Sequence, residues 1–133
     1  MGAVTAVLVG ALVRARPFRA EVAGDSMAPT LMAGDWLIAT RPDRLRRGHV
    51  VVVRHPERDL ELVKRVAALP GDPVDGRTLG AEEYLVVGDN RGASSDGRSF
   101  GPVRREAIVG VVRLRYWPHP GPVGWRGRRL GRW

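Results

Sequence analysis

The sequence predicts a mostly β protein, a small antiparallel sheet with a barrel-like curl, and three observations lead to this expectation. Short apolar runs rich in Val, Ile and Leu recur from residue 18 to residue 116. Gly, Pro and Asp bound these runs, and no run keeps the period of about 3.6 residues that marks a long amphipathic helix. The 133 residues, of which 44% are hydrophobic, suit one domain with a single modest core.

Six segments are predicted to be strands. In chain order they are Phe18 to Ala23, Trp36 to Thr40, His49 to Arg54, Glu61 to Leu69, Tyr84 to Val87 and Ile108 to Tyr116. Turns are expected at residues 32–35, 46–48 and 70–73, because each contains the Gly or Pro that tight turns require. Only 23 residues separate Lys64 from Gly88, which leaves no room there for a second domain.

Two segments of different character flank the expected domain of residues 18–116. Residues 1–17 include an uncharged apolar stretch, Gly2 to Val13, which as a helix would reach about 18 Å against the roughly 30 Å of a bilayer core. Arginines follow this stretch, whereas the charge of an export signal precedes it. We therefore expect a partial membrane anchor or a peripheral segment. Residues 117–133 form a tail rich in Gly, Pro and Arg.

The composition excludes several kinds of site. Without cysteine there is no disulfide, thiolate metal site or thiol nucleophile. The three histidines, His49, His55 and His119, are not at ligand spacing, so neither a metal nor a cofactor is predicted. The net charge of +8 is divided among separate arginine clusters, and only 6% of the residues are aromatic. Nucleic acid is therefore not an expected partner.

Lysine occurs once among the 22 basic residues, at Lys64, and the others are all arginine. An arginine keeps its proton, whereas a lysine can lose one, so the single lysine indicates a general base. In a strand, alternation puts Leu62, Lys64 and Val66 on one face. Burial among apolar groups then lowers the pKa of the amine from about 10.4. An ordinary solvated side chain is the alternative.

A hydroxyl that such a base could activate is that of Ser26, in the loop Gly24-Asp25-Ser26-Met27-Ala28-Pro29. Gly24 allows close approach of the backbone, and Pro29 fixes a φ angle just after the serine. Ser26 and Lys64 are therefore a predicted Ser/Lys nucleophilic dyad, with the Ser26 amide as an oxyanion donor. A turn residue or helix cap is the alternative for the serine.

A third segment, Gly88 to Val103, is a run of small and polar residues after a predicted strand. It follows the segment Ser26 to Leu31 and the pair Lys64-Arg65, after which comes Pro70-Gly71-Asp72. The three segments in this order resemble the boxes of type I signal peptidases, the S26 family of Ser/Lys endopeptidases. The resemblance runs from about Val22 to Tyr116. It implies the signal-peptidase catalytic fold without the large inserted second domain of larger relatives.

The resemblance also implies roles for individual residues. Ser26 would be the nucleophile and Lys64 the base, with Ser94 orienting the lysine amine by a hydrogen bond. Asp96 and Arg98 would form an ion pair that braces the loop beneath the site. Three apolar residues would wall shallow pockets for the small residues before the cleaved bond: Val22, Met27 and Leu31.

The chain departs from the family pattern at two glycines. Gly97 replaces the serine that the family has between Asp96 and Arg98, so that loop is expected to be bonded less tightly or in another way. Gly24 stands where some relatives have a serine as a second oxyanion donor, which leaves that donor unidentified.

The function that the resemblance implies is a serine endopeptidase that cleaves leader or signal peptides after small residues. Its partners would be a precursor protein and a membrane surface, with the catalytic domain outside the cytoplasm where an anchor exists. One alternative is a cytoplasmic protease similar to those that mature nickel-type superoxide dismutase, which Gly34-Asp35-Trp36 and Arg115-Tyr116-Trp117-Pro118 resemble. Remote alternatives are a self-cleaving repressor, for which no helical domain precedes Val22, and a non-catalytic basic β module.

Overall fold

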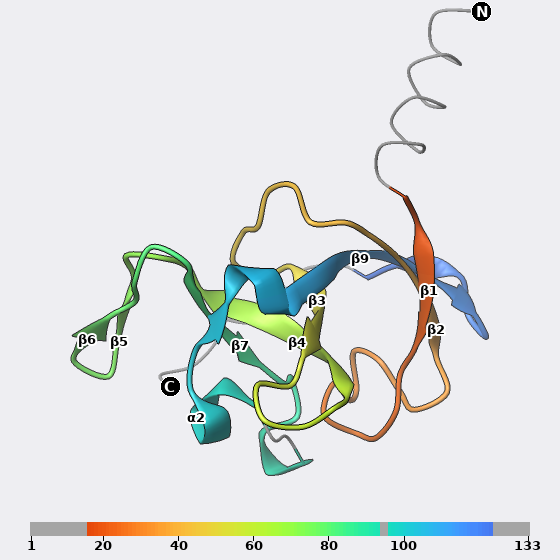
Figure 1. The fold of residues 1–133 in the computed structure, drawn as a ribbon. Helices are drawn as coiled ribbons and strands as arrows, with labels where there is room; N and C mark the ends of the chain where they lie inside the picture. The colour runs from red at the N-terminus through yellow and green to blue at the C-terminus, as the bar shows by residue number, and fades with distance from the viewer. Residues whose placement is uncertain (1–15, 94–95, 124–133) are drawn as a thin grey trace, which may run out of the picture.

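The structure, a computed structural model, describes residues 16–93 and 96–123. Its main feature is an eight-stranded antiparallel sheet in the order β1-β2-β9-β3-β4-β7-β8, with β10 paired to β9. The sheet curls into a half-barrel (Figure 1), so the predicted mostly β fold is confirmed. Its strands are β1 Phe18–Glu21, β2 Trp36–Thr40, β3 Val50–Arg54, β4 Glu61–Ala68, β7 Glu83–Val87, β8 Val103–Arg104, β9 Ile108–Trp117 and β10 Gly121–Pro122. A separate hairpin pairs β5 (Pro73–Val74) with β6 (Arg77–Thr78).

Helical structure in the described part of the chain consists of short segments. These are η1 Arg91–Ala93, α2 Gly97–Phe100 and η2 Arg105–Ala107. The α2 helix begins after Asp96, whose carboxylate accepts a hydrogen bond from the Arg98 N–H and so caps the helix. The sequence predicted only a loop here, because one helical turn is too short to show a period. Within residues 16–93 and 96–123, no helix has the length and apolar character needed to cross a membrane.

Both faces of β3, at the centre of the sheet, are buried. Val50 and Val52 pack in one apolar cluster with the loop of residues 22–31. Val51 and Val53 pack in a second cluster on the opposite face. Successive strand residues point to opposite faces, so a run of four β-branched valines fits a strand that is covered on both sides. The 22–31 loop is therefore fixed to the core of the sheet.

Two glycines form turns where the sequence predicted them. Gly34 has φ of 90° and Gly48 has φ of 89°, in the left-handed region that glycine tolerates best. The Gly34 N–H donates to the Val22 carbonyl at 2.8 Å, and the Gly48 N–H donates to the Val66 carbonyl at 2.8 Å. These bonds tie the start of β2 to the loop that carries Ser26, and the start of β3 to β4.

All six predicted strands are present, with ends that differ by at most two residues. Trp117, which the sequence assigned to the tail, is the last residue of β9, and Gly121–Pro122 pair back onto it. The sheet therefore extends beyond residue 116. The four strands of two residues each were not predicted, because two residues are too few to show alternation. Residues 1–15 and 124–133 of the predicted terminal segments lie outside the described residues.

Candidate active site

Ser26 lies in the loop of residues 22–31 between β1 and β2. Three residues anchor this loop, because their side chains are at most 3% exposed and share one apolar cluster: Val22, Met27 and Leu31. The Leu31 N–H also donates to the Met27 carbonyl at 2.9 Å. Ser26 itself is half-buried, and its hydroxyl makes no hydrogen bond to residues 16–93 or 96–123. The loop therefore fixes the backbone of Ser26 by packing on both sides of it.

Lys64 is buried in β4, where it is 2% exposed and lies opposite Val51 of β3. Leu62 and Val66, on the same face of the strand, belong to one apolar cluster. Burial lowers the pKa of the Lys64 amine, the Asp96 carboxylate raises it, and the Arg98 guanidinium lowers it further. The net lowering increases the fraction of neutral amine at neutral pH, which is the form that accepts a proton.

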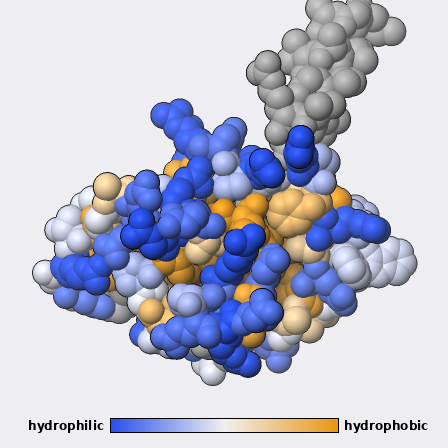
Figure 2. All heavy atoms as spheres, in the orientation of Figure 1, coloured by the Kyte–Doolittle hydropathy of each residue, from blue (hydrophilic) through white to orange (hydrophobic). Residues whose placement is uncertain are grey.

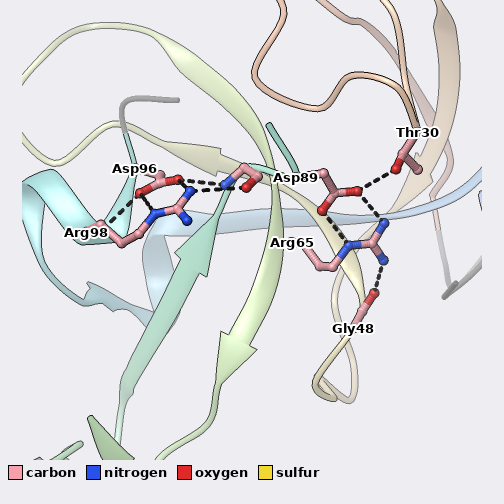
Figure 3. A network of polar contacts seen from close by, with 7 residues as sticks. Thr30, Gly48, Arg65, Asp89, Asp96 and Arg98 are labelled. Carbon is pink, nitrogen blue, oxygen red and sulfur yellow. Dashed lines mark hydrogen bonds and ion pairs between the residues drawn. The ribbon is translucent and has the colours of Figure 1, made fainter. Parts of the chain in front are cut away.

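Arg65, the residue after Lys64, joins β4 to two loops (Figure 3). Its guanidinium forms two hydrogen bonds of 2.8 Å with the Asp89 carboxylate and donates to the Gly48 carbonyl at 2.8 Å. The Thr30 hydroxyl donates to the same carboxylate at 2.6 Å. A bidentate pair of this kind fixes the orientation of both partners. Thr30, Arg65 and Asp89, here called the clamp, therefore connect the Ser26 loop to the strand of Lys64.

Asn90 adds two further bonds to the Ser26 loop. Its backbone N–H donates to the Ser26 carbonyl at 2.8 Å, and its side-chain amide donates to the Asp25 carbonyl at 3.0 Å. Because Asp89 and Asn90 are adjacent, one dipeptide contacts Arg65 and Ser26 at once. Three segments that are distant in the sequence, those of Ser26, Lys64 and Asp89, thus meet in one region.

Asp96 and Arg98 form an ion pair of 2.6 Å close to the clamp (Figure 3). Asp96 is fully buried and accepts a hydrogen bond from the Gly88 N–H at 2.7 Å, while Arg98 donates to the Gly88 carbonyl at 3.2 Å. Gly88 precedes Asp89, so this pair is connected to the start of the segment that reaches Ser26. Ser94, the remaining predicted residue of this segment, lies outside the described residues.

Gly97, where the chain departs from the family pattern, is packed too closely for a side chain. A Cβ atom built there would lie 2.6 Å from Leu85 Cδ1 and 2.6 Å from the Val86 carbonyl oxygen. The carbonyl belongs to the backbone of β7, which cannot rotate away as a side chain can. The loop is bonded instead through Asp96 and Arg98, and glycine at position 97 allows it to pack against the sheet.

A groove of about 510 Å³ is lined mainly by residues of β1, β3, β4 and β9, half of them apolar and half charged. Its apolar floor is formed by Phe18, Ala20, Val52, Val63 and Val109. Figure 2, in the orientation of Figure 1, shows apolar surface at the centre of the molecule with hydrophilic side chains on both sides of it. The three predicted pocket residues of the Ser26 loop pack in the same cluster as this floor but do not line the groove.

The histidines are engaged elsewhere. His49 Nδ1 accepts a hydrogen bond from the Arg46 N–H at 3.2 Å, and His55 Nδ1 accepts hydrogen bonds from the Glu57 and Arg58 N–H groups. His119 is exposed. In the part of the chain that the structure describes, no three His, Asp or Glu residues are grouped so that they could hold a metal ion.

The sequence did not identify the clamp, although one signal was present. Arg65 stands beside Lys64 in a strand whose two faces carry apolar residues, and a buried guanidinium needs a carboxylate partner. Asp89 was already part of the third segment, but nothing in the spacing pairs it with Arg65. The contacts of Thr30 and Asn90, and the residues of the groove, had no signal in the sequence.

Comparison with known proteins gives a family and several relatives. A profile of the family described as signal peptidase, peptidase S26, matches residues 1–79 and 73–117. Signal peptidase IB of Staphylococcus aureus strain Mu50 is 28% identical over 146 residues, which cover 73% of this chain and 76% of the relative. Signal peptidase I of Bacillus caldolyticus is 33% identical over 142 residues, which cover 73% of this chain and 78% of the relative. The two alignments have 146 and 142 positions, more than the 133 residues of this chain, because they include gaps where only the relative has a residue. The relatives therefore carry residues that this chain lacks.

Proposed function

This chain belongs to the peptidase S26 family of signal peptidases, which makes it a serine endopeptidase, and we propose that it removes leader peptides with Ser26 as nucleophile and Lys64 as general base. The observation that carries the proposal is the burial of the chain's single lysine, which lowers the pKa of its amine. A Ser/Lys dyad requires a neutral amine within reach of the serine hydroxyl, and in this structure the Ser26 hydroxyl forms no hydrogen bond with Lys64. The clamp supports the pairing, because it connects the strand of Lys64 to the loop of Ser26.

In the proposed reaction, the Ser26 Oγ attacks the scissile carbonyl carbon as its proton passes to the Lys64 amine. The Ser26 N–H stabilises the negative charge that develops on the carbonyl oxygen. When the C–N bond breaks, the Lys64 ammonium returns the proton to the departing amine, and the acyl group remains on Ser26. Water then attacks this ester and gives a proton to Lys64, which passes it to Ser26 Oγ as the acid is released.

The other predicted residues act on the dyad in this proposal. Ser94 orients the Lys64 amine, and the ion pair of Asp96 and Arg98 braces the loop beneath it. Asp96 and Arg98 also have opposite effects on the pKa of the Lys64 amine, because the carboxylate of Asp96 raises it and the guanidinium of Arg98 lowers it. Arg98 therefore helps to keep Lys64 neutral, in addition to holding Asp96.

The proposed substrate is a precursor protein that is cut after small residues of an extended leader. Val22, Met27 and Leu31 are the proposed walls of shallow pockets for those residues. The groove lies along β1, which is an edge strand of the sheet, and its apolar floor packs in the same cluster as these three residues. An extended peptide can add main-chain hydrogen bonds at such an edge while its side chains enter apolar pockets.

We assign this activity to the catalytic domain that the sequence predicts over residues 18–116, together with the end of the sheet that β9 and β10 form up to residue 122. We propose that it works at a membrane surface, outside the cytoplasm, with residues 1–17 contributing to an anchor. The alternative, a cytoplasmic protease of the kind that matures nickel superoxide dismutase, is not favoured, because the similar proteins named above are signal peptidases.

The test is cleavage of a leader-bearing precursor by the full chain and by Ser26→Ala and Lys64→Arg. We expect each variant to lose at least about a thousandfold in kcat/KM. Lys64→Arg keeps the positive charge but cannot act as a base, so it separates a catalytic amine from a structural cation. Arg46→Lys, at an exposed position, is the control and should cleave normally. Substantial cleavage by either dyad variant would contradict the proposal.

A further inference from the structure

Four arginines that line the groove have no partner in the described residues. Arg16, Arg19, Arg41 and Arg54 are exposed, and their side chains form no ion pair or hydrogen bond within residues 16–93 and 96–123. Every ion pair found in that part of the chain lies outside the groove lining. The groove therefore gathers guanidinium groups whose donors are available to a ligand.

The carboxylates of the groove do not balance these charges. Glu21 and Glu61 also line it, so four arginines against two glutamates leave an excess of two positive charges. Glu61 lies opposite Arg54 in the register of β3 and β4, yet the two side chains form no ion pair. Exposed guanidinium groups beside an apolar floor offer bidentate hydrogen bonds to a carboxylate.

Two of these arginines can be placed relative to the proposed site along their strands, Arg54 in β3 and Arg19 in β1, three residues before Val22. Arg54 is level with Glu61, which is three residues before Lys64 in β4 and so roughly 10 Å from it along the strand. Val22, which we assign to the residues before the cleaved bond, packs in the same cluster as the groove floor, so the groove receives the leader side. An extended leader cut at Ser26 would thus reach the arginines about four to six residues before the bond.

We propose that the four arginines, here called the arginine rim, select leader peptides that carry acidic side chains four to six residues before the cleaved bond. The inference rests on the proposed function, because it names the substrate class of the same site. Alternate residues of an extended peptide point to opposite sides. Apolar side chains can therefore face the floor, while acidic side chains reach the arginine rim.

An anionic membrane surface would also attract exposed arginines. The groove favours a peptide, because its arginines border a concave space of about 510 Å³ with an apolar floor, which the side chains of an extended chain can fill. A layer of lipid headgroups would contact the arginines and leave the floor empty. The experiment must therefore distinguish binding of a membrane surface from binding of a peptide.

The experiment uses three peptides that end their leader in Ala-x-Ala and differ only four to six residues before the bond, where they carry Glu, Gln or Lys. The kcat/KM of the full chain is measured at low and at high NaCl concentration. Binding is measured separately with Ser26→Ala by fluorescence anisotropy, so that charge preference is observed whether or not cleavage occurs. We expect the Glu peptide to exceed the Gln peptide by about fivefold to tenfold in both measurements at low salt, and the Lys peptide to be weakest. Salt should reduce these differences.

Charge reversal in the groove is the decisive variant. Arg19→Glu combined with Arg54→Glu should make the Lys peptide the preferred one. Arg44→Glu combined with Arg46→Glu changes the net charge equally at exposed positions outside the groove lining and should keep the preference for Glu. This pair separates a local effect of the arginine rim from an effect of the total charge.

Equal binding and equal kcat/KM of the three peptides would overturn the inference. It would also be overturned if groove charge reversal reduced binding to phosphatidylserine vesicles but left the peptide preference unchanged. If Ser26→Ala prefers the Glu peptide while the wild type cleaves none of the three, the arginine rim is supported and the proposed function fails.

Discussion

Arg65 and Asp89 form a bidentate ion pair between the strand that carries Lys64 and the segment that contacts Ser26. The guanidinium is 6% exposed and the carboxylate 14% exposed, so water could hardly replace either partner. The Thr30 hydroxyl donates to the same carboxylate. The alignment of the Ser26 loop with the Lys64 strand therefore depends on the charge of Asp89 as well as on backbone bonds.

Asp89→Asn keeps the size of this side chain and removes its charge. Because it leaves the Arg65 guanidinium buried without a counter-ion, we expect the free energy of unfolding to fall by about 3–5 kcal/mol, measured by urea denaturation. Thr30→Val removes one hydrogen bond to the carboxylate and should cost about 1 kcal/mol. Glu106→Gln breaks an exposed ion pair with Arg104 and should have the smallest effect. An Asp89→Asn protein as stable as Glu106→Gln would contradict the role of the clamp.

The sheet could be predicted because its signals are local. The four valines of β3 are β-branched and consecutive, and glycines stand at the turns before β2 and β3, so each element is marked by its own residues. The β5 and β6 strands could not be predicted, because their two-residue pairing depends on the hairpin closing and not on a pattern along the chain. The α2 helix has one turn, and only its Asp96 cap marks it.

The candidate site was predictable only in part, since its supporting contacts are not local. Ser26 and Lys64 were proposed from residue type and order. Arg65 needs an acidic partner, but the sequence contains 14 Asp and Glu residues, and the pairing with Asp89 depends on the segment after β7 lying beside β4. Gly97 was visible as a departure from the family pattern. Its cause, the position of Leu85 and of the Val86 carbonyl, exists only in the folded sheet.

The lowered pKa of Lys64 predicts the acid side of the pH profile. A protonated amine cannot act as a base, so kcat/KM should rise about tenfold per pH unit below the pKa and level off above it, at a pH below about 10.4. Arg98→Gln removes a cation that lowers this pKa and leaves Asp96, which raises it, so the rise should move to higher pH. Arg77→Gln breaks an exposed ion pair and should not move it. The check is kcat/KM measured from pH 5 to pH 10. If kcat/KM of Arg98→Gln rises at the same pH as that of the wild type, the result argues against Lys64 as the base.

Lys64→Met should increase stability while abolishing cleavage. The pKa of Lys64 is lower in the folded chain than in the unfolded chain, so the unfolded chain binds more protons between those two values. The free energy of unfolding of the wild type therefore rises with pH through this interval, up to about pH 10.4. Methionine has no charge to bury, so the advantage of the variant should be largest below the lowered pKa and shrink as the pH rises. Thermal denaturation of both proteins at several pH values measures this, and a difference that stays constant with pH would rule out the lowered pKa.

Gly97→Ser introduces the residue of the family pattern at a position where this chain has no space for it. The new Cβ would lie 2.6 Å from Leu85 Cδ1 and from the Val86 carbonyl oxygen, so α2 must shift together with its Asp96 cap. We expect a loss of about 1–3 kcal/mol in stability, and lower kcat/KM because Asp96 moves relative to Lys64. Gly92→Ser, in the same segment, meets only Asn90 Oδ1 at 3.9 Å and should change neither quantity.

A second substitution separates the two contacts of this Cβ. Leu85→Ala removes the side-chain contact but leaves the Val86 carbonyl in place, so it should recover only part of the stability that Gly97→Ser loses, after correction for the cost of Leu85→Ala alone. Denaturation of the two single variants and the double variant measures this coupling. No coupling would mean that Leu85 does not limit position 97. Complete recovery would mean that the carbonyl of β7 does not limit it, and the family's serine would then be excluded by one side chain alone.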